Sequence, residues 1–187
     1  MVIGGDTMHG FLKGNALLAC CALGVASPSF AATQGSAGAT STGTVGISAT
    51  VPGRVQISGL SDIVFGTVDP AVAAANSENV CVWSNTSGKG YTVTATGSGA
   101  SNAFALSDGT NSLAYAVEWA GSSGQSAGTA LVSGTALGGL STTAANPTCC
   151  SGPVATASLI VRMTAANLQA AVASSYTGTL TLVVAPQ

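Results

Sequence analysis

Side chains able to perform chemistry are few in this chain of 187 residues, which contains one histidine, five cysteines and six acidic residues. The histidine, His9, lies in an N-terminal segment with the pattern of an export signal, residues 1–31. Removal of that segment leaves a mature chain that begins at Ala32 and has no histidine. Ser-His-Asp and Cys-His catalysis both need a histidine as the base, so these enzyme classes are excluded, as are histidine-containing metal sites.

Five carboxylates remain in the mature chain, and two facing carboxylates could hydrolyse a glycosidic bond. They are Asp62, Asp69, Glu78, Asp108 and Glu118. The first four lie near predicted turns or strand ends, where a solvated charge is ordinary. Glu118, beside Trp119, could line a binding groove, although a charge at a strand edge is the simpler interpretation. Nothing in the spacing brings two carboxylates together, so we expect no enzymatic activity, no metal site and no cofactor.

The mature chain keeps three cysteines, Cys81, Cys149 and Cys150. An exported protein folds in an oxidising compartment, so we expect a disulfide that joins Cys81 to Cys149 or to Cys150. The sequence does not choose between these two neighbours. Closing a loop of close to seventy residues would stabilise the fold by roughly 4 kcal/mol in the chain-entropy model. The third thiol would be either a small buried apolar group or part of a vicinal or intermolecular bridge.

The N-terminal segment has the parts of a signal peptide. A short basic start precedes an apolar run at residues 16–25, and residues 29–31 (Ser-Phe-Ala) satisfy the small-x-small cleavage rule. The apolar run is too short to span a membrane as a helix. Asp6 is unfavourable in such a start, which makes Met8 a second candidate for the first residue. A lipoprotein signal ending at Cys20 is the alternative interpretation, but few apolar residues precede it.

Charge is scarce, with four Lys and Arg against six Asp and Glu and a net charge of −2. So few cations cannot neutralise a track of phosphates, which excludes a nucleic-acid-binding protein. Hydrophobic residues make up 47% of the chain, too many for a disordered protein. Abundant Gly, Ser, Thr and Ala instead indicate a β-rich protein whose surface carries hydroxyl groups in place of ions.

Alternation of apolar and polar residues predicts a series of β-strands, most clearly at residues 176–185. The same alternation predicts strands at residues 54–58, 61–66, 79–84, 91–96, 103–106, 113–119, 130–133 and 155–163. Turn residues at 85–90 and at Asp108-Gly109 predict two β-hairpins. Thr164 has the position of an N-cap for one short helix, residues 165–172. Together these elements predict an all-β, immunoglobulin-like sandwich over residues 54–187.

Residues 32–53 precede this predicted sandwich. Residues 32–43 are rich in Gly, Ser, Ala and Thr without periodicity, which is typical of a flexible leader. Residues 44–51 alternate as a strand does, with an apolar face that consists of Val45, Ile47, Ala49 and Val51.

Several segments follow one another in a defined order over most of the mature chain, namely residues 79–85, 90–97, 104–106, 113–119 and 176–186. This order resembles the spore coat protein U-like domain of secreted bacterial pilins assembled by the chaperone–usher route. The resemblance implies a structural, non-enzymatic subunit of an extracellular adhesive fimbria that supports attachment and biofilm formation. Many members carry an extra cysteine near the first strand. Residues 51–55 contain none, which puts the usual disulfide pattern in doubt.

The resemblance also implies partners and a mode of assembly. Pilin sandwiches of this type lack one strand, and a neighbouring subunit supplies it with its N-terminal extension. We therefore expect other pilin subunits, a periplasmic chaperone and an outer-membrane usher as partners, and a route through the periplasm to a cell-surface fimbrium. Residues 44–51 are the candidate donor strand. The alternative is that residues 44–51 form the first strand of their own sandwich.

A second class of function is a self-contained secreted carbohydrate-binding or tip adhesin module. Four aromatic residues could form a platform for a sugar, namely Trp83, Tyr91, Tyr115 and Trp119. Most of them alternate toward the predicted interior, which favours packing in the core. Binding of a specific glycan by the monomer would distinguish this module from a fimbrial subunit.

Overall fold

The computed structural model describes residues 31–149 and 154–187. The predicted export signal, apart from Ala31, and Cys150 lie outside the described residues. The chain divides into two compact units, Met1–Thr50 and Val51–Gln187. Within the part that the structure describes, no helix is long and apolar enough to cross a membrane.

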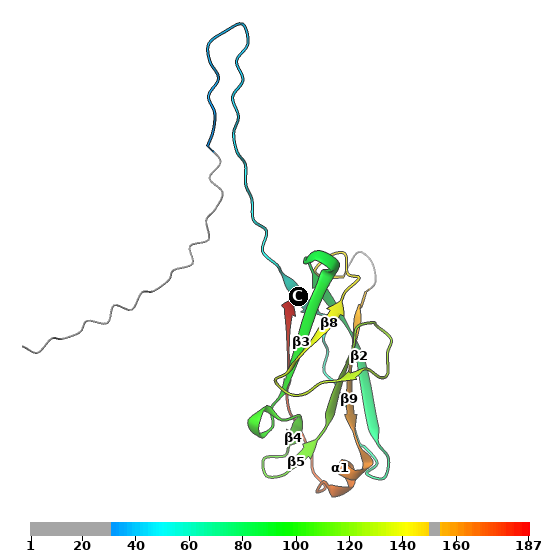
Figure 1. Cartoon of the computed structure of the whole chain (residues 1–187). Coiled ribbons are helices and arrows are strands. Elements are labelled where there is room, and N and C mark those ends of the chain that lie inside the picture. The colour runs from blue at the N-terminus through cyan, green and yellow to red at the C-terminus, as the bar shows by residue number, and fades with distance from the viewer. Residues whose placement is uncertain (1–30, 150–153) are drawn as a thin grey trace, which may run out of the picture. The chain divides into compact units, whose positions relative to one another are not determined.

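The second unit is built from antiparallel strands in two main sheets (Figure 1). The larger sheet has the order β1-β2-β9-β6-β7 and the smaller sheet the order β10-β3-β8. The larger sheet consists of β1 (Val55–Ser58), β2 (Ala74–Ser84), β9 (Ala157–Met163), β6 (Ala116–Ala120) and β7 (Thr129–Ala130). The smaller sheet consists of β10 (Leu180–Pro186), β3 (Gly90–Gly97) and β8 (Ala136–Ser141). One end carries a two-stranded ribbon, β4 (Ala105–Ser107) with β5 (Ser112–Ala114), and one helix, α1 (Ala165–Ala170). The chain also contains two short 3₁₀ turns among its described residues, η1 (Ser87–Lys89) and η2 (Ala100–Asn102).

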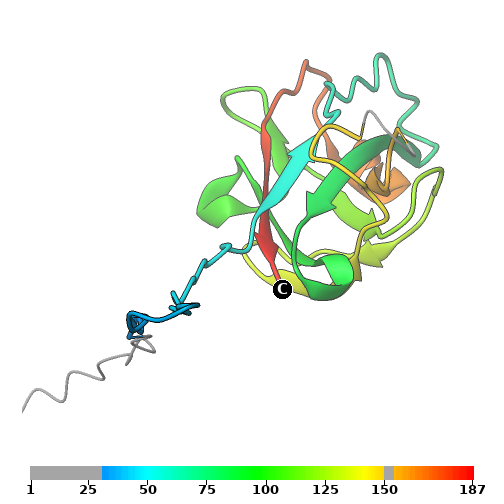
Figure 2. The ribbon, with the colours of Figure 1, turned by 90° about the horizontal axis from the view of Figure 1, so that it is seen from above.

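A hydrophobic core lies between the two sheets. Figure 2 shows the ribbon of the sheets from above. Val82, Val93, Tyr91 and Trp119 are at most 1% exposed, and they come from strands of both sheets. Trp119 Nε1–H donates to the hydroxyl oxygen of Tyr91 at 3.2 Å, so the polar atoms of the two largest buried rings satisfy one another. Burying a large apolar side chain contributes about 1.5–3 kcal/mol to folding. The prediction of an all-β sandwich with one short helix is therefore confirmed.

Several predicted elements occur where the alternation indicated them. The last strand forms β10, which pairs along its length with β3, from Leu180 opposite Gly97 to Pro186 opposite Tyr91. Thr164 is the N-cap of α1, and its side chain accepts a hydrogen bond from the backbone N–H of Asn167 at 3.1 Å. The Asp108-Gly109 turn joins β4 to β5 as predicted.

The hairpin predicted across residues 85–90 is wrong. β2 belongs to the larger sheet and β3 to the smaller one, so this turn carries the chain from one sheet to the other. β2 has no free edge for β3 near the turn, because β1 pairs with one edge and Thr142 and Thr156 bond to Val82 on the other. Turn residues alone cannot reveal that both edges are taken.

Two predicted strands are absent and one strand was missed. Residues 44–51 and 61–66 form no strand, although their sequences alternate. The predicted strand at 113–119 is divided into β5 and β6, which lie in different sheets. β8 was missed within a segment predicted to be mostly loop. It contains Gly138 and Gly139, and the positive φ of 71° at Gly139 breaks the regular alternation.

Candidate functional site

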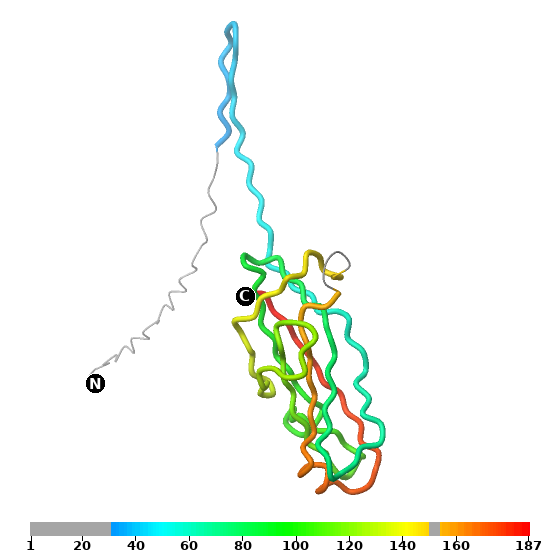
Figure 3. Tube along the Cα trace, turned by 90° about the vertical axis from the view of Figure 1, so that its right-hand side faces the viewer, coloured from blue at the N-terminus to red at the C-terminus, as the bar shows by residue number. Residues whose placement is uncertain are grey.

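One side of the sandwich is left open between an edge strand of each sheet. Among the described strands, β1 hydrogen-bonds only to β2, and β10 only to β3. β1 and β10 lie next to each other, with Cα atoms within 8 Å, yet they share no hydrogen-bonded register (Figures 2 and 3). Each strand therefore presents a row of backbone N–H and C=O groups without a partner strand. We call the side formed by β1, residues 61–66 and β10 the open side.

Apolar side chains along the open side face the core but remain partly exposed to solvent. They are Val55, Ile57, Ile63, Phe65, Leu180, Leu182 and Val184. The buried core residues of the central strands β2, β3, β6 and β9 are at 0–7% exposure instead. The core is therefore incompletely covered along this side, as it also is at the edge strand β8, where Leu137 and Leu140 are partly exposed.

Residues 61–66 explain why a predicted strand is absent from the open side. Ile63 and Phe65 pack against the core while Val64 between them is 75% exposed, which is the alternation of a strand. No backbone–backbone hydrogen bond of the described residues involves this segment. Its one anchor is Ser61, whose N–H and hydroxyl both donate to Glu78 Oε1 on β2. The segment has the sequence and the side-chain placement of a strand but no partner for its backbone.

The predicted donor residues are exposed in the structure. Val45 is 78% exposed, Ile47 90% and Val51 80%, and Ala49 is also exposed. In the first unit, Thr33 and Thr44 form an antiparallel bridge with N–H to O distances of 3.0 and 3.1 Å. The apolar face predicted for residues 44–51 is thus exposed to solvent.

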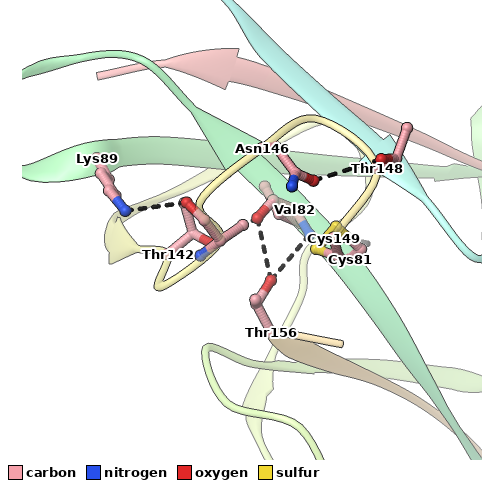
Figure 4. The surroundings of a disulfide bond; sticks show 9 residues. Cys81, Val82, Lys89, Thr142, Asn146, Thr148, Cys149 and Thr156 are labelled. Atoms are coloured by element: carbon pink, nitrogen blue, oxygen red, sulfur yellow. Dashed lines mark hydrogen bonds between the residues drawn. A yellow bond between two sulfur atoms is a disulfide. The ribbon is translucent and has the colours of Figure 1, made fainter. Parts of the chain in front are cut away.

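The disulfide joins Cys81 of β2 to Cys149, with Cα atoms 6.1 Å apart (Figure 4). The sequence left Cys149 and Cys150 as possible partners of Cys81, and in the structure the partner is Cys149. The bridge lies on the outer face of the larger sheet, in a small buried cluster with Ala144 and against Trp83. It ties down the crossover from β8 to β9.

Hydroxyl groups hold the same crossover to β2 (Figure 4). Thr142 and Thr156 both donate to the carbonyl oxygen of Val82, and Thr156 Oγ1 accepts from Val82 N–H at 2.9 Å. Lys89 Nζ donates to the carbonyl of Ala144 at 2.9 Å. These side chains act together with two backbone hydrogen bonds, from Thr156 N–H to the carbonyl of Val80 at 2.9 Å and from Thr142 N–H to the carbonyl of Lys89 at 3.1 Å.

The carboxylates serve local structure. Glu118 Oε1 accepts from Arg162 Nε at 2.9 Å, and its other oxygen accepts from Gly128 N–H at 2.9 Å, which pins a loop over the sheet. Hydrogen bonds from the side chain and backbone N–H of Asn111, then from Thr110 N–H, hold the pKa of Asp108 well below its usual range. Among the described residues, no group of three or more His, Cys, Asp or Glu could hold a metal ion.

The aromatic residues do not form a sugar platform. Tyr91, Tyr115 and Trp119 are at most 8% exposed, and only Trp83 of the four is half-buried at the surface. Burial raises the pKa of Tyr91, partly offset by the hydrogen bond from Trp119. Phe104 stacks on Tyr115 with ring centroids 5.8 Å apart. These rings pack the core, as their alternation favoured.

Comparison with known proteins gave matches among solved structures. No family model matches the chain, and no curated protein matches it. A solved structure described as a chaperone–tip adhesin complex vital for CFA/I fimbriae biogenesis is similar with a TM-score of 0.48 and 15% sequence identity. The match covers 72% of this chain and 41% of that chain, so this chain spans less than half the length of its structural neighbour.

Proposed function

We propose that this chain is a structural subunit of an extracellular adhesive fimbria, and that residues 44–51 of another copy complete its sandwich as a donor strand. The single observation that carries the proposal is the open side, where unpaired edges of both sheets flank partly exposed core residues. The exposed apolar face of residues 44–51 is the complementary feature of the same chain. A strand inserted between the edges would pair with their free backbone groups and would bury the apolar face of residues 44–51.

Insertion would gain free energy from apolar burial and from backbone hydrogen bonds. Val45, Ile47 and Val51 would each contribute about 1.5–3 kcal/mol on full burial, and Ala49 less. The inserted backbone would add hydrogen bonds to β10 on one side and to β1 and residues 61–66 on the other, at about 0.5–1.5 kcal/mol each. Ordering the donor costs about 1–2 kcal/mol per residue, so only the combination of both terms makes the association tight.

Insertion also requires a local movement. A strand placed between two others needs them to be about 9.6 Å apart, twice the usual strand spacing. Some Cα atoms of β1 and β10 come within 8 Å of one another, so β1 must move outward where the two strands are this close. The backbone of residues 61–66 has no partner strand, so no backbone hydrogen bond of this segment has to break before the donor enters.

The remaining parts of the proposal follow from this mechanism. An unfilled subunit exposes apolar surface, so a periplasmic chaperone would protect it and an outer-membrane usher would order assembly. The polymer would then lie on the cell surface and serve in attachment and biofilm formation. The order of segments that resembles the spore coat protein U-like domain supports the same interpretation.

The test compares two exposed positions of the donor segment. Ile47→Asn removes the largest side chain of the apolar face, and Ser48→Asn changes the opposite face. Because Ile47 is 90% exposed, Ile47→Asn should leave the thermal stability of the monomer unchanged, yet it should weaken multimer formation by about 10- to 100-fold. Ser48→Asn should assemble as the wild type does, and a chain without residues 32–51 should form no detergent-resistant multimers. Equal assembly by Ile47→Asn and Ser48→Asn would contradict the donor role of this face.

A further inference from the structure

Among the described residues of this nearly uncharged protein, one cationic side chain has no hydrogen-bond or ion-pair partner. The described residues contain three Lys and Arg side chains: Arg54, Lys89 and Arg162. Arg162 pairs with Glu118, and Lys89 donates to the carbonyl of Ala144. Within the described residues, the guanidinium of Arg54 is neither hydrogen-bonded nor ion-paired.

Arg54 stands in a surface depression at the end of the sandwich where β1 begins and β10 ends. The depression has a volume of about 520 Å³ and is lined by Gly53, Arg54, Val55, Gln56, Trp83, Pro147 and Pro186. Its walls are therefore an indole ring and two prolines beside one free guanidinium. We call this end of the sandwich the basic end.

The opposite end of the sandwich carries acidic side chains. Asp69 lies five residues before Ala74, which is the first residue of β2. Ala74 is paired with Met163 of β9, and Met163 directly precedes the N-cap of α1. Asp108 lies at the tip of the β4–β5 ribbon, which contacts the same helix. We call this end the acidic end.

The two aspartates differ in how many of their carboxylate oxygens already accept a hydrogen bond. Both carboxylate oxygens of Asp108 accept hydrogen bonds from its own loop, from Thr110 and Asn111. Asp69 uses only Oδ1, which accepts from Ala71 N–H at 2.9 Å in a tight turn. Val72 follows in that turn and is 60% exposed. The Asp69–Val72 turn, residues 69–72, therefore presents one available carboxylate oxygen beside one exposed apolar side chain.

The two ends cannot interact within one copy. β2 has 11 residues and connects one end to the other, a span of about 35 Å at 3.2–3.4 Å per residue. Charges this far apart are screened at physiological salt, where the Debye length is about 8 Å. An acidic partner for Arg54 from the opposite end would therefore have to come from another molecule.

Chain connectivity identifies that molecule if the donor strand runs antiparallel to β10. β10 runs from the acidic end to the basic end, so an antiparallel donor would place its Val51 at the acidic end of the acceptor. Only Pro52 and Gly53 separate Val51 from Arg54, a reach of about 10 Å. The basic end of the donor copy would then meet the acidic end of the acceptor copy. A parallel donor would instead bring two basic ends together.

We propose that the depression around Arg54 of one copy receives the Asp69–Val72 turn of the next copy, with Arg54 and Asp69 as an intermolecular ion pair. The guanidinium matches the available carboxylate oxygen, and Trp83 and the prolines match Val72. The contact sets the antiparallel orientation of the donor strand and stacks subunits end to end. The inference rests on the proposed donor-strand assembly.

Charge exchange in the full-length exported chain tests the contact. Arg54→Asp and Asp69→Arg should each slow the initial rate of multimer formation about two- to tenfold at low salt, and the double variant should recover to within twofold of wild type. The differences should vanish near 1 M salt, where the Debye length is about 3 Å. Asp108→Asn is the matched control, because it also removes an acid at the same end and should assemble at the wild-type rate.

A second readout does not depend on the rates. Arg54→Cys with Asp69→Cys should give disulfide-linked multimers on mild oxidation, whereas Arg54→Cys with Asp108→Cys should not. A double charge variant no faster than the single variants, or equal cross-linking in both cysteine pairs, overturns the proposal. Charge variants without effect while Ile47→Asn still weakens assembly refute this contact alone. Assembly by Ile47→Asn equal to that by Ser48→Asn refutes the donor mechanism itself.

Discussion

Loss of the disulfide should be the largest single perturbation of this sandwich. Cys81 and Cys149 are 68 residues apart in the sequence, and the chain-entropy model gives about 4 kcal/mol for closing such a loop. Replacing both cysteines by alanine should therefore lower the free energy of unfolding by about 4 kcal/mol. With a slope of about 1–3 kcal/mol per M in urea, the unfolding midpoint should fall by roughly 1.3–4 M.

Single replacements separate the two possible partners of Cys81. Urea unfolding followed by tryptophan fluorescence is a suitable assay, because the core contains Trp119 at 1% exposure. Cys150→Ala should unfold at the wild-type midpoint. Cys149→Ala should lose most of the 4 kcal/mol, as should wild type in the presence of a reductant. If Cys150→Ala is the variant that loses stability, or if the double alanine variant loses less than about 1 kcal/mol, the reasoning about this bridge is refuted.

Three further perturbations test the core, a loop and one acid. Tyr91→Phe leaves the Trp119 Nε1–H without an acceptor in the core, so it should cost about 1–3 kcal/mol in urea unfolding, and a cost near zero would show that the bond is unimportant. Glu118→Ala frees the Gly128 N–H, so hydrogen exchange at Gly128 should accelerate while global stability falls by no more than about 1 kcal/mol; unchanged exchange would contradict the pinned loop. Because the pKa of Asp108 is lowered in the folded chain, its ionisation favours folding above the ordinary aspartate value of about 3.9, and this gain is lost as pH falls through the folded pKa. Carboxyl NMR should show Asp108 still ionised well below pH 3.9, and a midpoint at the ordinary value would refute its hydrogen-bonded state.

The sequence predicted those elements whose local pattern agrees with their packing. β10 alternates because one face meets the core, and Thr164 caps α1 through a bond to a residue only three positions away. Residues 61–66 show the limit of this reasoning. Their alternation is real in the placement of Ile63 and Phe65, but strand formation also needs a partner that the pattern does not report.

Other features depend on long-range register, which local patterns do not contain. The turn at residues 85–90 joins two sheets because both edges of β2 are occupied. The choice between Cys149 and Cys150 depends on which side chain the crossover turns toward Cys81. The acidic and basic ends arise only after β1, β2 and β10 are aligned, so Arg54 gives no signal in the sequence. Alternation identified the apolar face of residues 44–51, and the resemblance to pilins implied its role as a donor strand; this role stays a prediction.

Hydrogen exchange of individual backbone amides tests the missing strand most directly. The full-length chain would be compared as a multimer and as a monomer held apart by Ile47→Asn. In the monomer, alternate amides of β10 and those of residues 61–66 should exchange fast, because no strand pairs with them. In the multimer these same amides, together with those of residues 44–51, should become strongly protected. Equal protection of these amides in both states would contradict the account.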